Sequence, residues 1–164
     1  MLETVFALLV YRRLEIRKTT RFLPFCPVYG CGALAMHYML TPFYNYPLIV
    51  VILGMIIGTT VEYVYGCITY KLYRVLLWDY AEEKHHYNRL ITPMFSALWA
   101  MLAPLFIYIV SPTVTPLIAA FPDYISYILL ILLTIDIAAT LNMLHNIRKG
   151  DSPERYLCPV MKKV

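Results

Sequence analysis

Long apolar stretches alternate with short polar ones along this chain of 164 residues. A helix needs about 20 mostly apolar residues to cross the roughly 30 Å hydrocarbon core of a membrane. The apolar stretches are continuous and do not alternate residue by residue, so they predict helices rather than the strands of a membrane barrel. We expect five helical segments, which cover residues 1–13, 24–44, 47–70, 91–110 and 124–145.

The first two segments are less regular than the other three. Residues 1–13 are too short to cross a membrane, because a helix rises only about 1.5 Å per residue. Residues 24–44 have a short apolar core, so this segment either crosses once or re-enters on the same side. The pattern predicts an all-α polytopic transmembrane helix bundle, with about four full spans and a short or truncated N-terminal helix. We expect residues 1–164 to form a single integral membrane domain.

The composition also indicates a membrane protein. The chain is 60% hydrophobic and 15% charged, whereas soluble domains are about 45–50% apolar and about 25% charged. These values exclude an ordinary soluble domain. They also exclude intrinsic disorder, which requires low hydrophobicity and high charge.

The Lys and Arg residues lie only in alternate loops and in the C-terminal tail. Five lie in residues 12–21, four in residues 71–89 and five in the tail, whereas residues 41–46 and 111–123 contain none. Because basic residues concentrate in cytoplasmic loops, the C-terminus is predicted to be cytoplasmic and residues 24–44 to be a true crossing. A nucleic-acid-binding protein would carry its basic residues along an exposed face, so no nucleic-acid partner is expected.

Four polar residues fall inside the apolar segments: Glu3, His37, Glu62 and Asp136. A charged side chain in the hydrocarbon layer is costly, so an acidic residue there is a candidate functional residue. For Asp136, the alternative is a hydrogen-bonded pair with Thr140, one turn away. For His37, the alternative to a proton relay is a hydrogen bond to a backbone carbonyl.

Glu62 has the most informative surroundings of these residues. It lies four residues from Gly58 and four from Gly66, and Gly54 continues the same face of the helix. Small residues at this spacing let two membrane helices approach closely. We therefore expect Glu62 to face a neighbouring helix. Two interpretations stay open, a functional carboxyl group or a neutral carboxyl group that only fixes helix packing.

No common catalytic motif is present. The sequence lacks the G-x-S-x-G, H-E-x-x-H and G-x-x-x-x-G-K-[ST] patterns, which mark hydrolases, zinc proteases and P-loop ATPases. The four cysteines lack the spacing of a structural zinc site. We expect no enzymatic activity, no metal and no cofactor, so ATP-driven transport would need an ATPase on another polypeptide.

Three motifs follow one another along the chain. They are Pro24-Phe25-Cys26-Pro27-Val28-Tyr29-Gly30-Cys31-Gly32-Ala33, then Val61-Glu62-Tyr63-Val64-Tyr65-Gly66, then Trp78-Asp79-Tyr80, with Phe95-Ser96 and Trp99 after it. Together they resemble the P-x-Y-G-x-G, V-E-Y and W-D-Y motifs of a bacterial family of type IV ABC-transporter permeases. Leu2-Glu3 resembles the first helix of that family. The resemblance marks as motif residues Pro27, Tyr29, Gly30, Gly32, Trp78, Asp79 and Tyr80.

The chain departs from the family pattern after the third motif. Ala81 replaces the usual serine, and Arg89 stands where a glycine would align.

The motifs also predict local structure. P-x-Y-G-x-G is expected to break a helix at the inner membrane face, where the freed backbone groups must be buried in protein or line a wet cavity. Trp78 and Tyr80 are typical interfacial anchors. Asp79 is expected to meet a basic residue of the neighbouring loop, one of Arg12, Arg13 and Arg21. An aromatic belt with a helix cap is the alternative role for this motif.

The resemblance implies a multi-pass protein of the bacterial inner (cytoplasmic) membrane. The leading hypothesis is a permease-like component of a transport system, with the four membrane-embedded polar residues inside its bundle. One alternative is a non-transporting scaffold or regulatory subunit, and another is an intramembrane enzyme that acts on lipids. The expected partners are the lipid bilayer, a separate ATPase subunit and a second copy of the chain.

Overall fold

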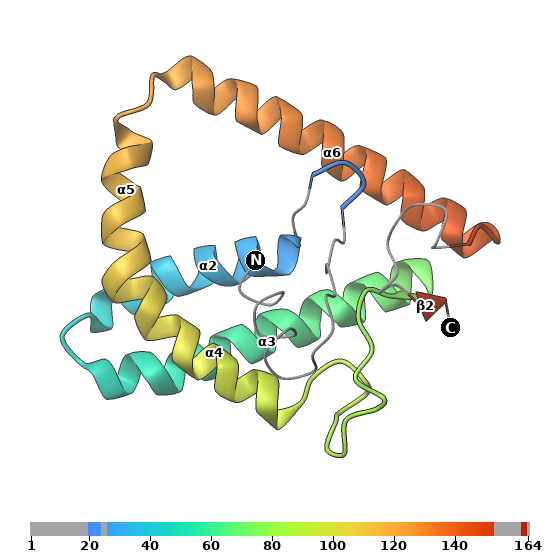
Figure 1. The fold of residues 1–164 in the computed structure, drawn as a ribbon, viewed down its shortest axis with the longest axis horizontal. Coiled ribbons are helices and arrows are strands. Elements are labelled where there is room, and N and C mark those ends of the chain that lie inside the picture. Colours follow the sequence, from blue (N-terminus) through green and yellow to red (C-terminus); the bar gives the residue numbers. More distant parts are fainter. Residues whose placement is uncertain (1–19, 24–25, 153–161, 164) are drawn as a thin grey trace, which may run out of the picture.

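The computed structural model describes residues 20–23, 26–152 and 162–163, and most of this described chain is helical (Figure 1). The helices are α2 (Pro27–Leu40), α3 (Pro47–Tyr73), α4 (Pro93–Leu105), α5 (Ser111–Ala119) and α6 (Asp123–Lys149). A 3₁₀ turn, η1 (Thr41–Phe43), follows α2, and a π-helical turn, η2 (Phe106–Val110), joins α4 to α5. The predicted helix over residues 1–13 lies outside the described residues.

Helix α3 is the central helix of the fold. Its 27 residues extend about 40 Å at 1.5 Å per residue, which exceeds the hydrocarbon core. Pro47 suits the first position of the helix, where its missing N–H has no intrahelical partner. The buried residues of α3 recur every three or four positions and form one stripe, which consists of Val50, Gly54, Ile57, Gly58, Glu62, Gly66 and Thr69.

The chain from Pro93 to Ala119 is one uninterrupted helical span of 27 residues. The prediction of a loop over residues 111–123 is therefore wrong, because α5 continues to Ala119. Prolines inside this span cost backbone hydrogen bonds, and the π-helical turn follows Pro104 directly. Hydroxyl groups bond the carbonyls one turn earlier, from Thr113 to Ile109 and from Thr115 to Ser111, each at 2.7 Å.

Helix α2 is about half as long as α3. Its 14 residues extend only about 21 Å, and η1 extends it by one turn. Its buried residues are Val28, Gly32, Met36 and Leu40, again four apart. Their spacing places one face of α2 against α3 along its length.

Helix α6 packs only through its C-terminal half. Its buried residues are Asp136, Thr140, Met143, Leu144 and Ile147. The large apolar side chains before Asp136 are exposed, and Leu130 is 60% exposed. In a membrane, lipid tails solvate such side chains as well as a protein interior does.

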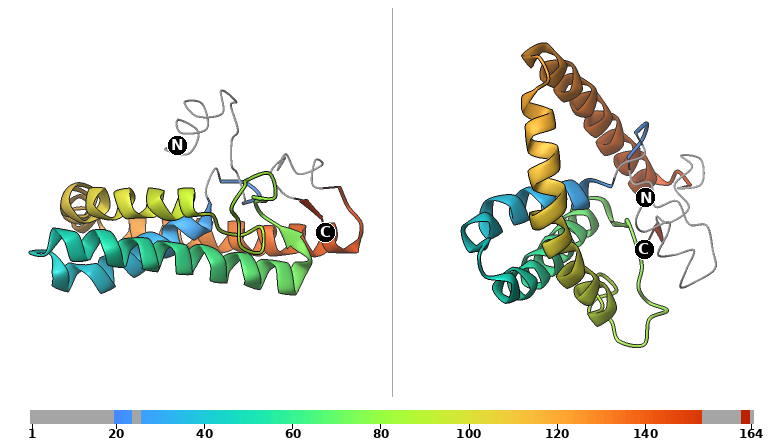
Figure 2. Two further views of the ribbon diagram at one scale, coloured as in Figure 1. Left: turned by 90° about the horizontal axis from the view of Figure 1, so that it is seen from below. Right: turned by 60° about the vertical axis from the view of Figure 1, so that its left-hand side comes forward.

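Helix α3 packs against both α2 and α4 (Figure 1). Residues 74–92 form the α3–α4 loop, in which β1 (Val75–Leu76) pairs antiparallel with β2 (Lys162–Lys163). This loop and the C-terminal ends of α3 and α6 lie on one side of the molecule, and the turn between α2 and α3 lies on the other (Figure 2). Arg148 Nη1 ties the two helix ends together by donating to the carbonyl of Leu72 at 2.9 Å.

The structure confirms the predicted helical, polytopic architecture. In the described part of the chain, three helical spans are long and apolar enough to cross a membrane: α3, residues 93–119 and α6. The shorter helix α2 packs against α3.

Candidate functional site

Glu62 is the centre of a buried polar cluster on the packed face of α3. The residue is only 6% exposed. Its Oε1 accepts a hydrogen bond from the Tyr80 hydroxyl at 2.8 Å, and its Oε2 accepts one from Trp99 Nε1 at 3.0 Å. Tyr80 belongs to the α3–α4 loop and Trp99 to α4, so this one carboxyl group joins three elements. Hydrogen bonds of this kind strengthen when water is excluded from them.

Two further aromatic rings complete what we call the Glu62 cluster: Tyr29, Glu62, Tyr80, Phe95 and Trp99. The rings of Tyr80 and Phe95 are stacked, with centroids 4.6 Å apart and an interplanar angle of 23°. The ring of Tyr29 lies 5.5 Å from that of Trp99, at an angle of 36°. Each of the three sequence motifs therefore supplies one residue to a single cluster.

Glycines on α3 make this close packing sterically feasible. A Cβ atom on Gly58 would lie 2.4 Å from Cδ2 of Trp99, and one on Gly54 would lie 2.0 Å from the Cβ of Ala103. A Cβ on Gly66 would lie 2.8 Å from Cδ2 of Leu90. Gly54 and Gly58 therefore lie at the contact with α4, and Gly66 lies at the contact with the α3–α4 loop.

The α3–α4 loop folds inward at its third motif. Trp78 and Tyr80 are each only 4% exposed. Trp78 Nε1 donates to the carbonyl of Leu90 at 2.9 Å, and the backbone N–H of Tyr80 donates to the carbonyl of Arg89 at 3.0 Å. Both aromatic residues are therefore parts of the protein interior rather than anchors exposed at a membrane surface.

Asp79 forms an ion pair with Arg89 of the same loop. Arg89 Nε donates to Asp79 Oδ1 at 2.9 Å, and Arg89 Nη2 donates to Asp79 Oδ2. Asp79 Oδ1 also accepts from the backbone N–H of Ala81 at 2.9 Å. The hydrogen bonds to Asp79 raise the pKa of the Arg89 guanidinium, so it stays charged at physiological pH.

Arg89 is a partner of Asp79 that the sequence analysis does not name. Of the expected partners, Arg12 and Arg13 lie outside the described residues. The backbone N–H of Arg21 donates to Thr140 Oγ1 at 3.0 Å, on α6. A partner ten positions away in the same loop needs only a short closure, which costs little entropy.

The P-x-Y-G-x-G motif forms the first turns of α2, so the prediction that it breaks a helix is wrong. Pro27 stands at the first helical position, where proline is well tolerated. Gly32 is buried, and a Cβ atom there would lie 3.1 Å from the Trp99 ring, whereas Gly30 has nothing within 4 Å. The motif thus forms the start of α2, and its Gly32 packs against the Trp99 ring.

The other predicted polar residues belong to separate contacts. His37 Nδ1 lies 3.0 Å from Ser111 Oγ, between α2 and α5. Asp136 Oδ1 accepts from the backbone N–H of Phe22 at 2.7 Å. Its Oδ2 is buried and has no hydrogen-bond partner among the described residues. Glu3 lies outside the described residues, so the described chain does not gather these groups around Glu62.

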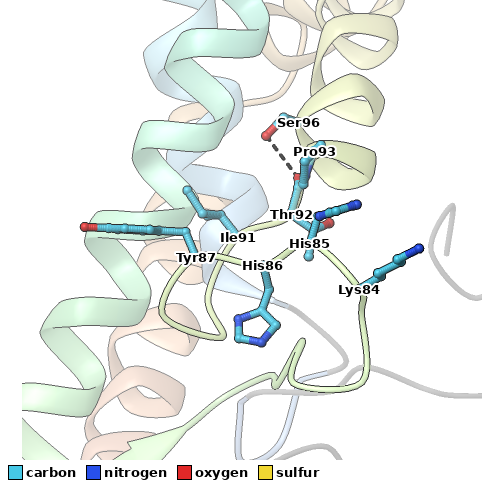
Figure 3. A pocket seen from close by; sticks show the side chains of 8 residues that line it. All are labelled: Lys84, His85, His86, Tyr87, Ile91, Thr92, Pro93 and Ser96. Atoms are coloured by element: carbon cyan, nitrogen blue, oxygen red, sulfur yellow. Dashed lines mark hydrogen bonds between the residues drawn. The ribbon is translucent and has the colours of Figure 1, made fainter.

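A hollow of about 460 Å³ opens beside the N-terminus of α4 (Figure 3). It is lined by Lys84, His85, His86, Tyr87, Ile91, Thr92, Pro93 and Ser96. The Ser96 hydroxyl is occupied, because it donates to the carbonyl of Thr92 at 3.1 Å. The described residues contain no group of three or more His, Cys, Asp or Glu that could hold a metal ion. The hollow shares no residue with the Glu62 cluster.

Sequence reasoning left Trp99, Phe95 and Arg89 out of the candidate site. Phe95 and Trp99 are four residues apart on α4, and this spacing indicates a shared helix face. That signal could have placed both opposite the glycine face of α3. No comparable signal in the sequence points to Arg89.

Comparison with known proteins identifies a family but no individual relative. No curated protein and no solved structure matches the chain. One family model, described as "Putative ABC-transporter type IV", matches residues 1–142. The match includes every residue of the Glu62 cluster, and it confirms the resemblance carried by the three motifs. This helical membrane protein therefore belongs to the family described as "Putative ABC-transporter type IV".

Proposed function

We propose that this chain is the membrane-embedded, permease-like subunit of a transport system in the bacterial cytoplasmic membrane, with its C-terminus in the cytoplasm. The family match and the three apolar spans support a transport role. The basic residues at the ends of α3 and α6 lie on the side of the α3–α4 loop, and the positive-inside rule assigns that side to the cytoplasm.

A separate ATPase subunit supplies the energy in this proposal. The sequence contains no P-loop pattern, and that pattern is what cradles the phosphates of ATP in this class of ATPase. Co-expression of the chain with an ATPase encoded next to its gene, followed by purification in mild detergent, would test the partnership. A stoichiometric complex that hydrolyses ATP supports it.

The observation that carries the proposal is the carboxyl group of Glu62. It lies inside an apolar span, yet its hydrogen bonds extend to both α4 and the α3–α4 loop. A group placed in this way links the membrane interior to a loop that we assign to the cytoplasm. Its protonation or its hydrogen bonds can therefore change together with the position of that loop.

Glu62→Gln separates the charge of Glu62 from its shape. The amide oxygen can accept from the Trp99 indole, which is only a donor, and the amide NH₂ can donate to Tyr80, because a tyrosine hydroxyl both donates and accepts. We therefore expect Glu62→Gln to fold normally and to lose transport, and Glu62→Ala to lose both folding and transport. The measurement pairs thermal melting in detergent with complementation of the growth defect of a deletion strain. Glu82→Gln, on an exposed residue of the α3–α4 loop, is the matched control and should complement fully.

A scaffold or regulatory subunit is the second candidate function. The observation that favours it is that both oxygens of Glu62 accept hydrogen bonds from buried aromatic side chains, as a packing contact requires. In that case Glu62→Gln would fold and also complement fully. This result would end the transport role proposed for Glu62.

A further inference from the structure

We propose that Arg89 is a positioning residue for Glu62. Through its ion pair with Asp79, it fixes the part of the α3–α4 loop that places the Tyr80 hydroxyl on the Glu62 carboxyl group. The relevance of this control to transport rests on the proposed function, whereas the geometry and its test do not.

The first step is the connection from Arg89 to Tyr80. Residues 78–80 and 89–90 are bound to each other at three points. These are the Asp79–Arg89 ion pair, the bond from the Tyr80 N–H to the Arg89 carbonyl, and the bond from the Trp78 indole to the Leu90 carbonyl. Because Tyr80 directly follows Asp79, loss of the ion pair frees the backbone that aims the Tyr80 ring at Glu62.

The second step is that the loop does not adopt this shape by default. Arg89 has a φ angle of 64° and Asn88 one of 51°, both in the left-handed region. Asparagine tolerates this region, whereas it is uncommon for arginine, so contacts with the surroundings stabilise both residues there. For Asn88, the enforcing contact is the bond from its Nδ2 to the Tyr63 hydroxyl at 3.0 Å. For Arg89, it is the pair of bonds to Asp79.

The third step is the difference in solvent exposure between Asp79 and Arg89. The Asp79 side chain is 3% exposed and that of Arg89 is 40% exposed. Removal of the guanidinium takes two charge-assisted hydrogen bonds from a buried carboxylate, which is unfavourable. We expect the loop to rearrange so that Asp79 gains contact with water, and this movement carries Tyr80 away from Glu62.

The chain contains two tryptophans, Trp78 and Trp99, and this makes the inference measurable. Incorporation of 5-fluorotryptophan into the full-length protein in detergent gives one ¹⁹F resonance for each, assigned with Trp78→Phe. The Trp99 resonance reports on Glu62, because the indole donates directly to that carboxyl group. Arg89 has no hydrogen bond to Trp99 among the described residues. A shift of the Trp99 resonance in an Arg89 variant is therefore an indirect effect that passes through other residues.

The test compares Arg89→Gln, Tyr80→Phe and the double variant. Arg89→Gln keeps a Cβ atom, so the backbone strain at φ 64° is retained and only the ion pair is lost. We expect both single variants to move the Trp99 resonance in the same direction. The double variant should move it no further than Tyr80→Phe does, because the effect passes through the Tyr80 hydroxyl. Lys84→Gln removes a charge from an exposed position of the same loop and should leave the resonance in place.

Two results would overturn the inference. One is a Trp99 resonance that stays in place in Arg89→Gln, and the other is a shift in the double variant equal to the sum of the single shifts. If Arg89→Gln does not fold, Asp79→Asn gives the same test, because Asn keeps the acceptor for the Ala81 N–H and removes the charge. Failure of the proposed function would leave these spectra unchanged, since they require no transport.

Discussion

Gly58→Ala is the substitution that most directly tests the packing of α3 against α4. The new Cβ atom would lie 2.4 Å from Cδ2, 2.5 Å from Cγ and 2.7 Å from Cε3 of Trp99. These atoms belong to a rigid ring that Glu62 and Tyr29 hold in position. The ring cannot rotate away locally, so either the helices separate or Trp99 leaves Glu62.

Three contributions set the loss of stability that we expect for Gly58→Ala. Overpacking of a dense interior costs about 1–3 kcal/mol, and loss of a hydrogen bond to a carboxylate costs about 1.5–3 kcal/mol. Replacement of glycine by alanine inside a helix stabilises the helix by about 1 kcal/mol. The net destabilisation is therefore about 1.5–5 kcal/mol, which lowers the melting temperature by about 3–20 °C at 2–4 °C per kcal/mol.

Gly30→Ala is the matched control for this substitution. Gly30 also lies in a helix, but a Cβ atom there would have nothing within 4 Å. It gains the same helix propensity without a clash, so its melting temperature should equal or exceed that of the wild type. Thermal unfolding of both variants in one detergent is the assay. A Gly58→Ala protein that melts together with Gly30→Ala would refute the contact between Trp99 and the glycine face.

Two further predictions concern topology and the contact at Asp136. A reporter fused after Val164 should read cytoplasmic, and one inserted at Phe121, between α5 and α6, should read external; an external C-terminus would reverse the orientation argued from the basic residues. Asp136→Ala removes the acceptor for the Phe22 N–H and should speed tryptic cleavage after Arg21 several-fold relative to Asp123→Ala, because a lost buried hydrogen bond is worth about 1–3 kcal/mol. An unchanged cleavage rate would show that this contact does not hold residues 20–23.

The helical architecture could be predicted because its cause is local. Apolar runs of spanning length leave a helix as the way to satisfy the backbone in lipid. The end of the fourth segment could not be read in this manner. Ser111 and Pro112 are typical of a loop, because Pro112 has no N–H to donate to the carbonyl one turn earlier. Threonine hydroxyl groups nevertheless add hydrogen bonds to the neighbouring carbonyls of Ile109 and Ser111. The helix therefore continues through a sequence that would break one in water.

The candidate site was predictable only in part, and for a similar reason. The spacing of Gly58, Glu62 and Gly66 places Glu62 on a packed face, since helical periodicity is a property of the sequence itself. Its donors depend on tertiary structure. Tyr80 reaches Glu62 because the loop turns back at Asn88 and Arg89, both left-handed without being glycine. Asn88 is a residue type that tolerates this conformation, but nothing local in the sequence predicts it for Arg89, which contacts with Asp79 stabilise there.

The two buried acids within the described spans, Glu62 and Asp136, differ in the groups that donate hydrogen bonds to them. Asp136 accepts from the backbone N–H of Phe22, so its contact fixes a chain segment and is independent of the side chain at that position. Glu62 accepts hydrogen bonds from the side chains of Trp99, on an adjacent span, and Tyr80, in a loop. A bond from a tyrosine hydroxyl can break and re-form when that loop moves, without unfolding of a helix. Glu62 is therefore the acid whose hydrogen bonds can change with the loop, as the proposed function requires, whereas the bond to Asp136 holds Phe22 on α6.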